Sequence, residues 1–105
     1  ERIEHDGLVI DLARRTVSRR GRGVALTAKE FDLLALLATG RDRAWTRSDL
    51  LDRLWPGEEE GSAHVVNSHI NRLRAKIEAD PARPRYIETV WGVGYRFGGD
   101  PGAAR

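Results

Sequence analysis

The segment from His64 to Glu78, HVVNSHINRLRAKIE, constrains the fold more than any other stretch of the chain. Four of its apolar residues recur at the three- and four-residue spacing of an α-helix, so they form one narrow stripe. These residues are Val66, Ile70, Leu73 and Ile77. Such a stripe gains stability only when other elements cover it and remove it from water. The segment therefore predicts a helix in a small core, with Ser62 as its N-cap. It should end before Pro81, since the residue before proline disfavours helical geometry.

The opposite side of this helix is small in its middle, hydrogen-bonding throughout and basic at its edges. Its residues are His64, Ser68, Asn71, Arg72 and Ala75, with His69 and Arg74 on the two flanks. An α-helix fits the DNA major groove, where arginine can bond guanine twice and asparagine can bond adenine twice. Flanking cations suit phosphates. On this helix alone, an ordinary amphipathic surface helix with solvated arginines is the simpler interpretation, and calmodulin or membrane binding would use a similar face.

Two more helices are predicted upstream, each from a start signal followed by an apolar face. Thr27 with Glu30 three residues later matches a capping box, and the apolar residues of TAKEFDLLALLA then recur at helical spacing. Thr46 with Asp49 repeats the signal before a second helix, which the sequence Pro-Gly ends. The residues RDRA between the two helices are predicted to form a loop.

Segments typical of strands lie at both ends of the chain. Residues 7–12 and 16–26 predict an antiparallel meander whose last turn is the sequence Gly-Arg-Gly. After the third helix, the runs Tyr86–Val90 and Tyr95–Phe97 enclose two glycines, which predicts a hairpin with both glycines at positive φ. Capped helices followed by a basic helix and a Gly-rich hairpin predict a helix-turn-helix variant with a β-wing.

Composition excludes several classes of protein. A chain of 105 residues is expected to form one domain with a single modest core. The absence of cysteine excludes a disulfide scaffold and a cysteine-ligated metal, and it fits the cytosol as the expected location. No apolar run approaches the roughly 18 residues of a membrane span. The start, ERIEHDG, lacks the apolar core of a secretory signal, and the missing initiator Met favours a fragment of a longer chain. The net charge of +2 says little about partners.

The sequence offers little for catalysis, so we expect no enzyme and no cofactor. It contains no nucleophile elbow, no cysteine and no carboxylate pair with a reason for a shifted pKa. His64 and His69 are five residues apart and point in different directions, so no metal site is expected. A small nuclease is an alternative from another class, but it would need acidic metal ligands that the sequence does not place. Two binding alternatives also stay open, a winged helix that binds protein and a basic helix that binds RNA.

Three stretches in this order resemble one family. They are LTAKEFDLLALLA, TRSDLLDRLWPG and VVNSHINRLRAKIEADPARPRYIETVWGVGYRF. In spacing and sequence they resemble the OmpR/PhoB winged-helix output domains of bacterial two-component response regulators, from about Leu8 to Phe97. The resemblance implies an α+β winged helix-turn-helix with an N-terminal antiparallel sheet, three helices and a C-terminal hairpin. It implies a single domain with its core in residues 8–97. The residues that follow, GGDPGAAR (98–105), are expected to form a flexible tail.

The resemblance also implies DNA-binding residues. The family's third helix enters the major groove of double-stranded DNA, and its contact positions match His64, Val65, Ser68, His69, Asn71, Arg72 and Arg74. The family's base-reading arginine falls at Arg72, and Arg47 and Trp55 match positions that hold the DNA backbone. His64, Val65 and Ser68 depart from the residues common in the family, so the target sequence cannot be carried over.

In the wing, Trp91 stands where relatives often have an arginine that enters the minor groove, and Arg96 is an alternative wing contact. From the residues alone, we expect Trp55 mainly in the core, Arg47 exposed and Arg96 as a solvated strand residue. Trp91 either packs on the DNA backbone or caps the hairpin.

The partners implied by the resemblance are DNA, RNA polymerase, a second copy of the domain, a receiver domain and a sensor histidine kinase. The loop from Pro56 to Gly61 matches one proposed to touch RNA polymerase, through Glu58, Glu59 and Glu60. Without the resemblance, this acidic run is only a solvated loop. Binding as a homodimer on two half-sites is expected on DNA. A receiver domain N-terminal to Glu1 and a sensor histidine kinase are expected in the full-length system, and no membrane partner is expected.

Overall fold

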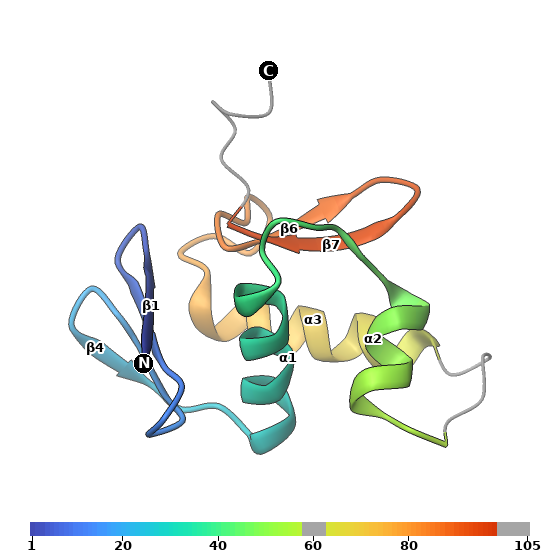
Figure 1. Cartoon of the computed structure of the whole chain (residues 1–105). Coiled ribbons are helices and arrows are strands. Elements are labelled where there is room, and N and C mark those ends of the chain that lie inside the picture. Colours follow the sequence, from blue (N-terminus) through green and yellow to red (C-terminus); the bar gives the residue numbers. More distant parts are fainter. Residues whose placement is uncertain (58–62, 99–105) are drawn as a thin grey trace.

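The computed structural model describes residues 1–57 and 63–98, and it confirms the predicted α+β winged fold (Figure 1). The fold consists of two small antiparallel sheets packed against three helices. The elements are β1 (Arg2–His5), β2 (Leu8–Asp11), β3 (Thr16–Arg19), β4 (Arg22–Val24), α1 (Ala28–Thr39), β5 (Trp45–Thr46), α2 (Arg47–Leu54), α3 (Ala63–Ile77), β6 (Ile87–Val90) and β7 (Gly94–Phe97). In the described ranges, none of the helices is long and apolar enough to cross a membrane.

The N-terminal sheet has the order β1-β2-β3-β4 with every pair antiparallel, as the meander predicts. The predicted Gly-Arg-Gly turn is wrong by one residue. Arg19 pairs with Arg22, so the two-residue turn consists of Arg20 at φ 50° and Gly21 at φ 83°. Two successive residues at positive φ match the twist of a hairpin, which favours glycine at the second position. The sheet also contains β1, which the sequence reading did not include.

The helices form as their start signals predict. At α1 the Thr27 hydroxyl accepts from the Glu30 N–H and the Glu30 carboxylate accepts from the Thr27 N–H, which confirms the capping box. At α2 the Thr46 hydroxyl accepts from the Asp49 N–H. The stripe of α3 is confirmed, since its four apolar residues are completely buried among α1, α2 and both sheets.

The second sheet has the order β5-β7-β6, and the β6–β7 hairpin is the wing. Strand β5 directly follows the residues predicted as a loop, and the sequence did not predict it, because a two-residue strand has no pattern of its own. It exists because Trp45 pairs with Tyr95 across the sheet. Gly92 lies at φ 80°, as predicted. Gly94 does not: a Cβ there would lie 2.0 Å from the Trp45 carbonyl oxygen, so it is needed for close approach of two backbones.

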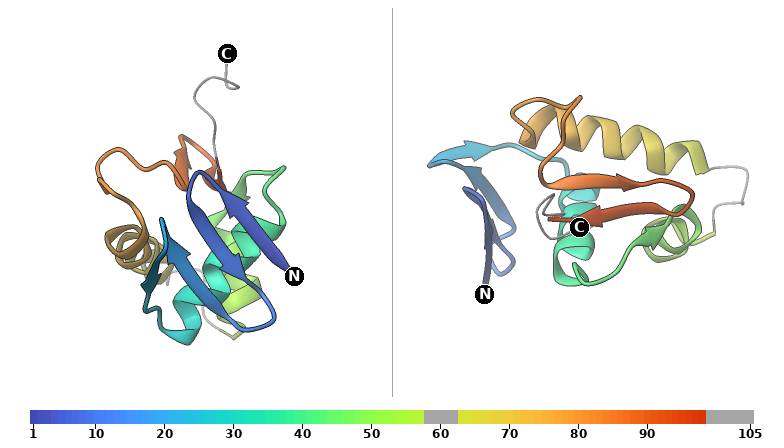
Figure 2. Two further views of the ribbon diagram at one scale, coloured as in Figure 1. Left: turned by 90° about the vertical axis from the view of Figure 1, so that its left-hand side faces the viewer. Right: turned by 90° about the horizontal axis from the view of Figure 1, so that it is seen from above.

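The arrangement leaves one side of α3 uncovered. The wing runs alongside α3, and the N-terminal sheet lies beside its C-terminal end (Figure 2). Helices α1 and α2 pack against the buried stripe of α3. The outward side of α3 is therefore bordered by the wing along its length and by the N-terminal sheet at its C-terminal end.

Candidate nucleic-acid interface

The polar face predicted for α3 points to solvent. His64, Asn71, Arg72 and Ala75 are exposed, and Ser68 is half-buried on the same side. Rotating the helix about its axis would expose the buried stripe, so packing fixes which side points outward. The middle of this face carries small side chains, which lets a flat or grooved partner approach the helix closely.

Arg72 is the exposed arginine on this face. In the part of the chain that the structure describes, its guanidinium forms no hydrogen bond or ion pair with another residue. A guanidinium carries five N–H donors in a fixed planar fork. All of them are therefore available to an external acceptor.

A polar network behind the face joins α2, α3 and the wing. The Asn67 Oδ1 atom accepts from Arg47 Nε at 2.7 Å and from the Tyr95 hydroxyl at 2.8 Å. The Arg47 guanidinium also lies 5.2 Å from the centre of the Tyr95 ring. The expectation of an exposed Arg47 is therefore wrong, because these bonds hold it half-buried in the first turn of α2. Its partners are neutral, so its positive charge is not cancelled.

Arg74 ties α3 to β6. Its Nε and one terminal nitrogen donate to the Ile87 carbonyl at 3.0 and 2.7 Å, and the terminal nitrogen also donates to the Thr89 hydroxyl at 2.9 Å. Burial lowers the pKa of the Arg74 guanidinium below its ordinary value, yet arginine stays protonated in proteins. Most of its donors are thus used inside the protein, so any phosphate contact uses what remains.

A second cluster consists of Trp55, His69 and Lys29. It lies where the C-terminal end of α2 and the N-terminal end of α1 meet the flank of α3. The ring centres of Trp55 and His69 are 4.9 Å apart in an edge-to-face arrangement. Lys29 Nζ lies 5.5 Å from the Trp55 ring centre and donates to the Leu54 carbonyl at 2.6 Å. His69 Nδ1 lies 2.9 Å from the carbonyl oxygen of Val65, which is half-buried. Trp55 packs against the core while remaining half-buried, as expected.

The wing carries the most exposed aromatic residue. Trp91 is 90% exposed in the turn between β6 and β7, so the interpretation that it caps the hairpin is wrong. Val93 in the same turn is 41% exposed. Arg96 is not merely solvated, since its Nε donates to the Glu88 carboxylate at 2.7 Å across the hairpin. Trp91 and Val93 thus give the tip of the wing an apolar surface.

Some predicted features lie outside the described residues. These are Glu58, Glu59 and Glu60, proposed to contact polymerase, and the predicted N-cap Ser62. Within residues 1–57 and 63–98, no three or more histidine, aspartate or glutamate side chains gather as a metal site would require.

The sequence reading missed Asn67, Tyr95, Thr89 and Lys29 as parts of this surface. Asn67 falls between the buried stripe and the exposed face, so periodicity assigns it to neither. Thr89 and Tyr95 look like ordinary strand residues until the wing is folded against α3. Lys29 sits in the first turn of α1, and only the packing of α1 against α2 brings it to Trp55. None of these placements has a local signal in the sequence.

The chain matches a known protein family. The model of the family described as "Transcriptional regulatory protein, C terminal" matches residues 21–97. Among curated relatives, the sensory transduction protein RegX3 of Mycobacterium leprae is 43% identical over 95 residues, which are 90% of this chain and 48% of RegX3. The DNA-binding response regulator MtrA of Mycolicibacterium smegmatis is 43% identical over 89 residues, or 85% of this chain and 39% of MtrA. The chain thus spans less than half the length of either relative.

Solved structures agree with this match. The response regulator DrrB of Thermotoga maritima, an OmpR/PhoB homologue, superposes with a TM-score of 0.86 at 41% identity, over 93% of this chain and 44% of DrrB. The DNA-binding domain of Klebsiella pneumoniae RstA, solved in complex with the RstA box, gives a TM-score of 0.83 at 35% identity. That alignment covers 92% of this chain and 96% of the RstA domain.

Proposed function

The chain belongs to the family of C-terminal domains of transcriptional regulatory proteins, of the OmpR/PhoB type. From this premise we propose that it binds double-stranded DNA sequence-specifically as the output domain of a response regulator. It is a regulatory DNA-binding module and not an enzyme. The observation that carries the proposal is the outward face of α3, which combines small side chains with Asn71 and an Arg72 whose donors are available.

In the proposed complex, α3 lies in the major groove. Arg72 hydrogen-bonds to base edges, with guanine as the base whose two acceptors match its fork. Asn71 and Ser68 lie on the same face and contact neighbouring bases, with His64 and Val65 at the N-terminal end of the helix. Specificity then comes from the α3 face, whereas orientation comes from contacts to phosphates.

Phosphate contacts are proposed for the basic residues beside α3. Arg47 keeps its charge because Asn67 and Tyr95 are neutral partners, and their bonds hold its guanidinium in a fixed place. His69 and Lys29 lie around Trp55 on the other flank. Arg74 contributes through its charge, since most of its donors serve the wing. A helix in the groove with basic residues on both flanks can contact both sugar-phosphate backbones that border the groove.

The wing is proposed to contact the neighbouring minor groove or its sugar-phosphate edge. Trp91 is exposed at the tip and carries no charge, so its contact with DNA is apolar. Arg96 is held by Glu88 and is the weaker candidate for a wing contact.

The larger system is also a proposal. The curated relatives are about twice as long as this chain, which is consistent with a receiver domain that a sensor histidine kinase phosphorylates. We propose residues 8–97 as the core of a single DNA-binding domain, with a second copy on an adjacent half-site. The acidic residues 58–60 are proposed to contact RNA polymerase.

The experiment that tests the proposal is selection from a random duplex library, followed by anisotropy titration of the selected duplex at several salt concentrations. Specific binding should emerge, with log K falling linearly against log salt because phosphate contacts release counterions. A control duplex of the same composition and scrambled order should bind more weakly. If no sequence is enriched from duplexes carrying either one or two half-sites, the proposal is wrong.

A further inference from the structure

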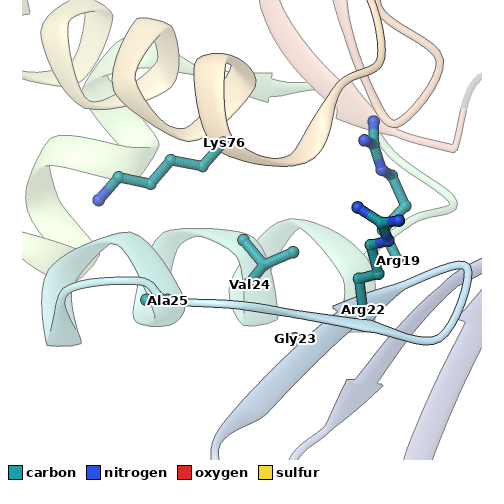
Figure 3. Close-up of a pocket in the computed structure, with 6 residues that line it drawn as sticks. All are labelled: Arg19, Arg22, Gly23, Val24, Ala25 and Lys76. Carbon is teal, nitrogen blue, oxygen red and sulfur yellow. The ribbon is translucent and has the colours of Figure 1, made fainter.

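A basic pocket lies beside the C-terminal end of α3, outside the face proposed to read bases. Its volume is about 360 Å³, and it is lined by Arg19, Arg22, Gly23, Val24, Ala25 and Lys76. Figure 3 shows where its cations lie: Arg19 and Arg22 are on the β3–β4 hairpin, and Lys76 is on α3. Strand β4 is an edge of the N-terminal sheet, so the sheet does not close the pocket on that side.

The charges of these three side chains are not equally available. Lys76 Nζ is 2.6 Å from the buried Glu30 carboxylate, which neutralises it. Arg19 donates to the Ile77 carbonyl at 3.2 Å, a neutral partner that leaves its charge in place. Arg22 is exposed, and its side chain has no hydrogen bond or ion pair within the described ranges. The pocket therefore keeps two positive charges, and one guanidinium has all its donors available.

The end of a helix normally repels an anion, because its last carbonyls carry partial negative charge. Here the Arg19 guanidinium covers the last residue of α3, Ile77. It donates to one of the last carbonyls of the helix, and it places a full positive charge beside that carbonyl. This arrangement favours an anion at a helix end that would be unfavourable without Arg19.

The pocket continues the proposed DNA-binding surface. Arg72 and Lys76 are four residues apart in α3, so they lie on one flank of the helix, one turn apart. The β3–β4 hairpin lies beside the end of α3 that follows Lys76, as the right-hand view of Figure 2 shows. A duplex that meets Arg72 and extends past the C-terminal end of α3 would next meet this pocket.

We propose that the pocket binds a backbone phosphate of the DNA that flanks the base pairs read by α3, with Arg22 as the main donor. The inference rests on the proposed function, since it needs DNA on α3. Arg22 forms the contact directly, while Arg19 sets the local charge and keeps the helix end from opposing it. The pocket adds affinity and register without adding base readout.

The test compares Arg22→Gln with Arg14→Gln on the selected duplex over a range of salt concentrations. Arg14 is an exposed arginine at the opposite end of the same sheet, so both variants lose one charge. Losing one phosphate contact should lower the magnitude of the slope of log K against log salt by about 0.9 in Arg22→Gln. Arg14→Gln should keep the wild-type slope. Arg22→Lys should also have the wild-type slope, because lysine keeps the positive charge at this position.

A second arm shortens the duplex from one end at a time. One truncation should lower the wild-type slope by the same amount and leave Arg22→Gln unchanged, because both changes remove the same contact. Equal slopes for Arg22→Gln and Arg14→Gln would overturn the inference. So would a loss seen only on duplexes with two half-sites, which would assign the pocket to a neighbouring copy. If wild type binds no duplex specifically, the proposed function itself fails.

Discussion

At the scale of single residues, two buried carboxylates hold the interface elements in place. Glu78 is 4% exposed, directly after α3. Its carboxylate accepts the backbone N–H groups of Arg85, Tyr86 and Ile87 at 2.7, 3.1 and 2.9 Å. It thus fixes the start of β6 against the end of α3. Glu30 is 2% exposed and binds Lys76, which anchors the same turn of α3 to the first turn of α1.

Glu78→Gln should destabilise the fold by about 1–3 kcal/mol, because an amide cannot accept all three buried N–H groups with the strength of a carboxylate. Urea unfolding followed by circular dichroism measures this loss. Glu4→Gln is the matched control, since Glu4 is exposed and should change the free energy of unfolding by less than about 0.5 kcal/mol. Equal midpoints for the two variants would show that the Glu78 bonds contribute nothing.

Glu30 should make stability depend on pH in the acid range. Burial alone would raise the pKa of its carboxyl, but the hydrogen bonds and charge of Lys76 and the bonds to Thr27 outweigh burial and lower the pKa below its usual 4.5. The folded pKa is then below the unfolded pKa. The ionised carboxylate therefore stabilises the fold above about pH 4.5, and this contribution is lost as pH falls through the lower folded value.

Glu30→Gln should lose this dependence. Unfolding free energies measured from neutral pH down through the acid range should converge with those of wild type as pH falls. A difference between the two proteins that stays constant with pH would contradict the lowered pKa.

At the scale of elements, the helices and the wing were predictable from sequence, and the strand edges were not. The capping box at Thr27 and the stripe of α3 are local signals, because each arises within one or two turns of chain. Strand β5 depends on Trp45 meeting Tyr95, and the turn at Arg20–Gly21 depends on the register of β3 and β4. Such pairings join distant residues or differ by one position, so local composition does not specify them.

Gly94→Ala should destabilise the domain by about 1–3 kcal/mol or more, because the new Cβ would overlap the Trp45 backbone and separate β5 from β7. Gly23→Ala is the control, since a Cβ at Gly23 meets no atom within 4 Å. Thermal unfolding of both variants measures the difference. A Gly94→Ala protein as stable as Gly23→Ala would mean that the two strands separate at little cost.

The network of Arg47, Asn67 and Tyr95 should be energetically coupled, because one amide oxygen accepts from both donors. A double-mutant cycle of Asn67→Ala and Tyr95→Phe, measured by urea unfolding, should give a coupling free energy of about 0.5–3 kcal/mol. The same variants should also bind the selected DNA more weakly, since the wing is less firmly held against α3. Additive effects on unfolding would show that the wing and α3 are held independently.

At the scale of the whole molecule, the net charge of +2 conceals an uneven distribution. Away from α3, several arginines are paired with carboxylates, as in Arg2–Glu4, Arg15–Asp32, Arg43–Asp49 and Arg85–Asp6. Beside α3, Arg47 and Arg74 instead have neutral partners. The side of the molecule that carries α3 therefore keeps positive charge of the kind that these ion pairs neutralise elsewhere.

This distribution explains how much of the candidate site the sequence could predict. The face of α3 follows from helical periodicity, so the exposed positions of His64, Asn71 and Arg72 were predictable. Which arginines lack a carboxylate partner was not predictable, because the pairing depends on carboxylates that folding brings from other elements. Arg96 was predicted to be solvated, but it is paired with Glu88. Arg47 was predicted to be exposed, but it is half-buried and hydrogen-bonded to Asn67.

The central claim is that the outward face of α3 reads DNA sequence through Arg72. The most direct test is the ratio of affinities for the selected and scrambled duplexes, measured by anisotropy for wild type, Arg72→Ala and the exposed-loop control Arg83→Ala. Losing a bidentate base contact costs about 1–3 kcal/mol of discrimination, so this ratio should fall about 5-fold to 160-fold for Arg72→Ala and stay near wild type for Arg83→Ala. An Arg72→Ala protein that binds both duplexes more weakly by the same factor would contradict base readout and make Arg72 a phosphate contact.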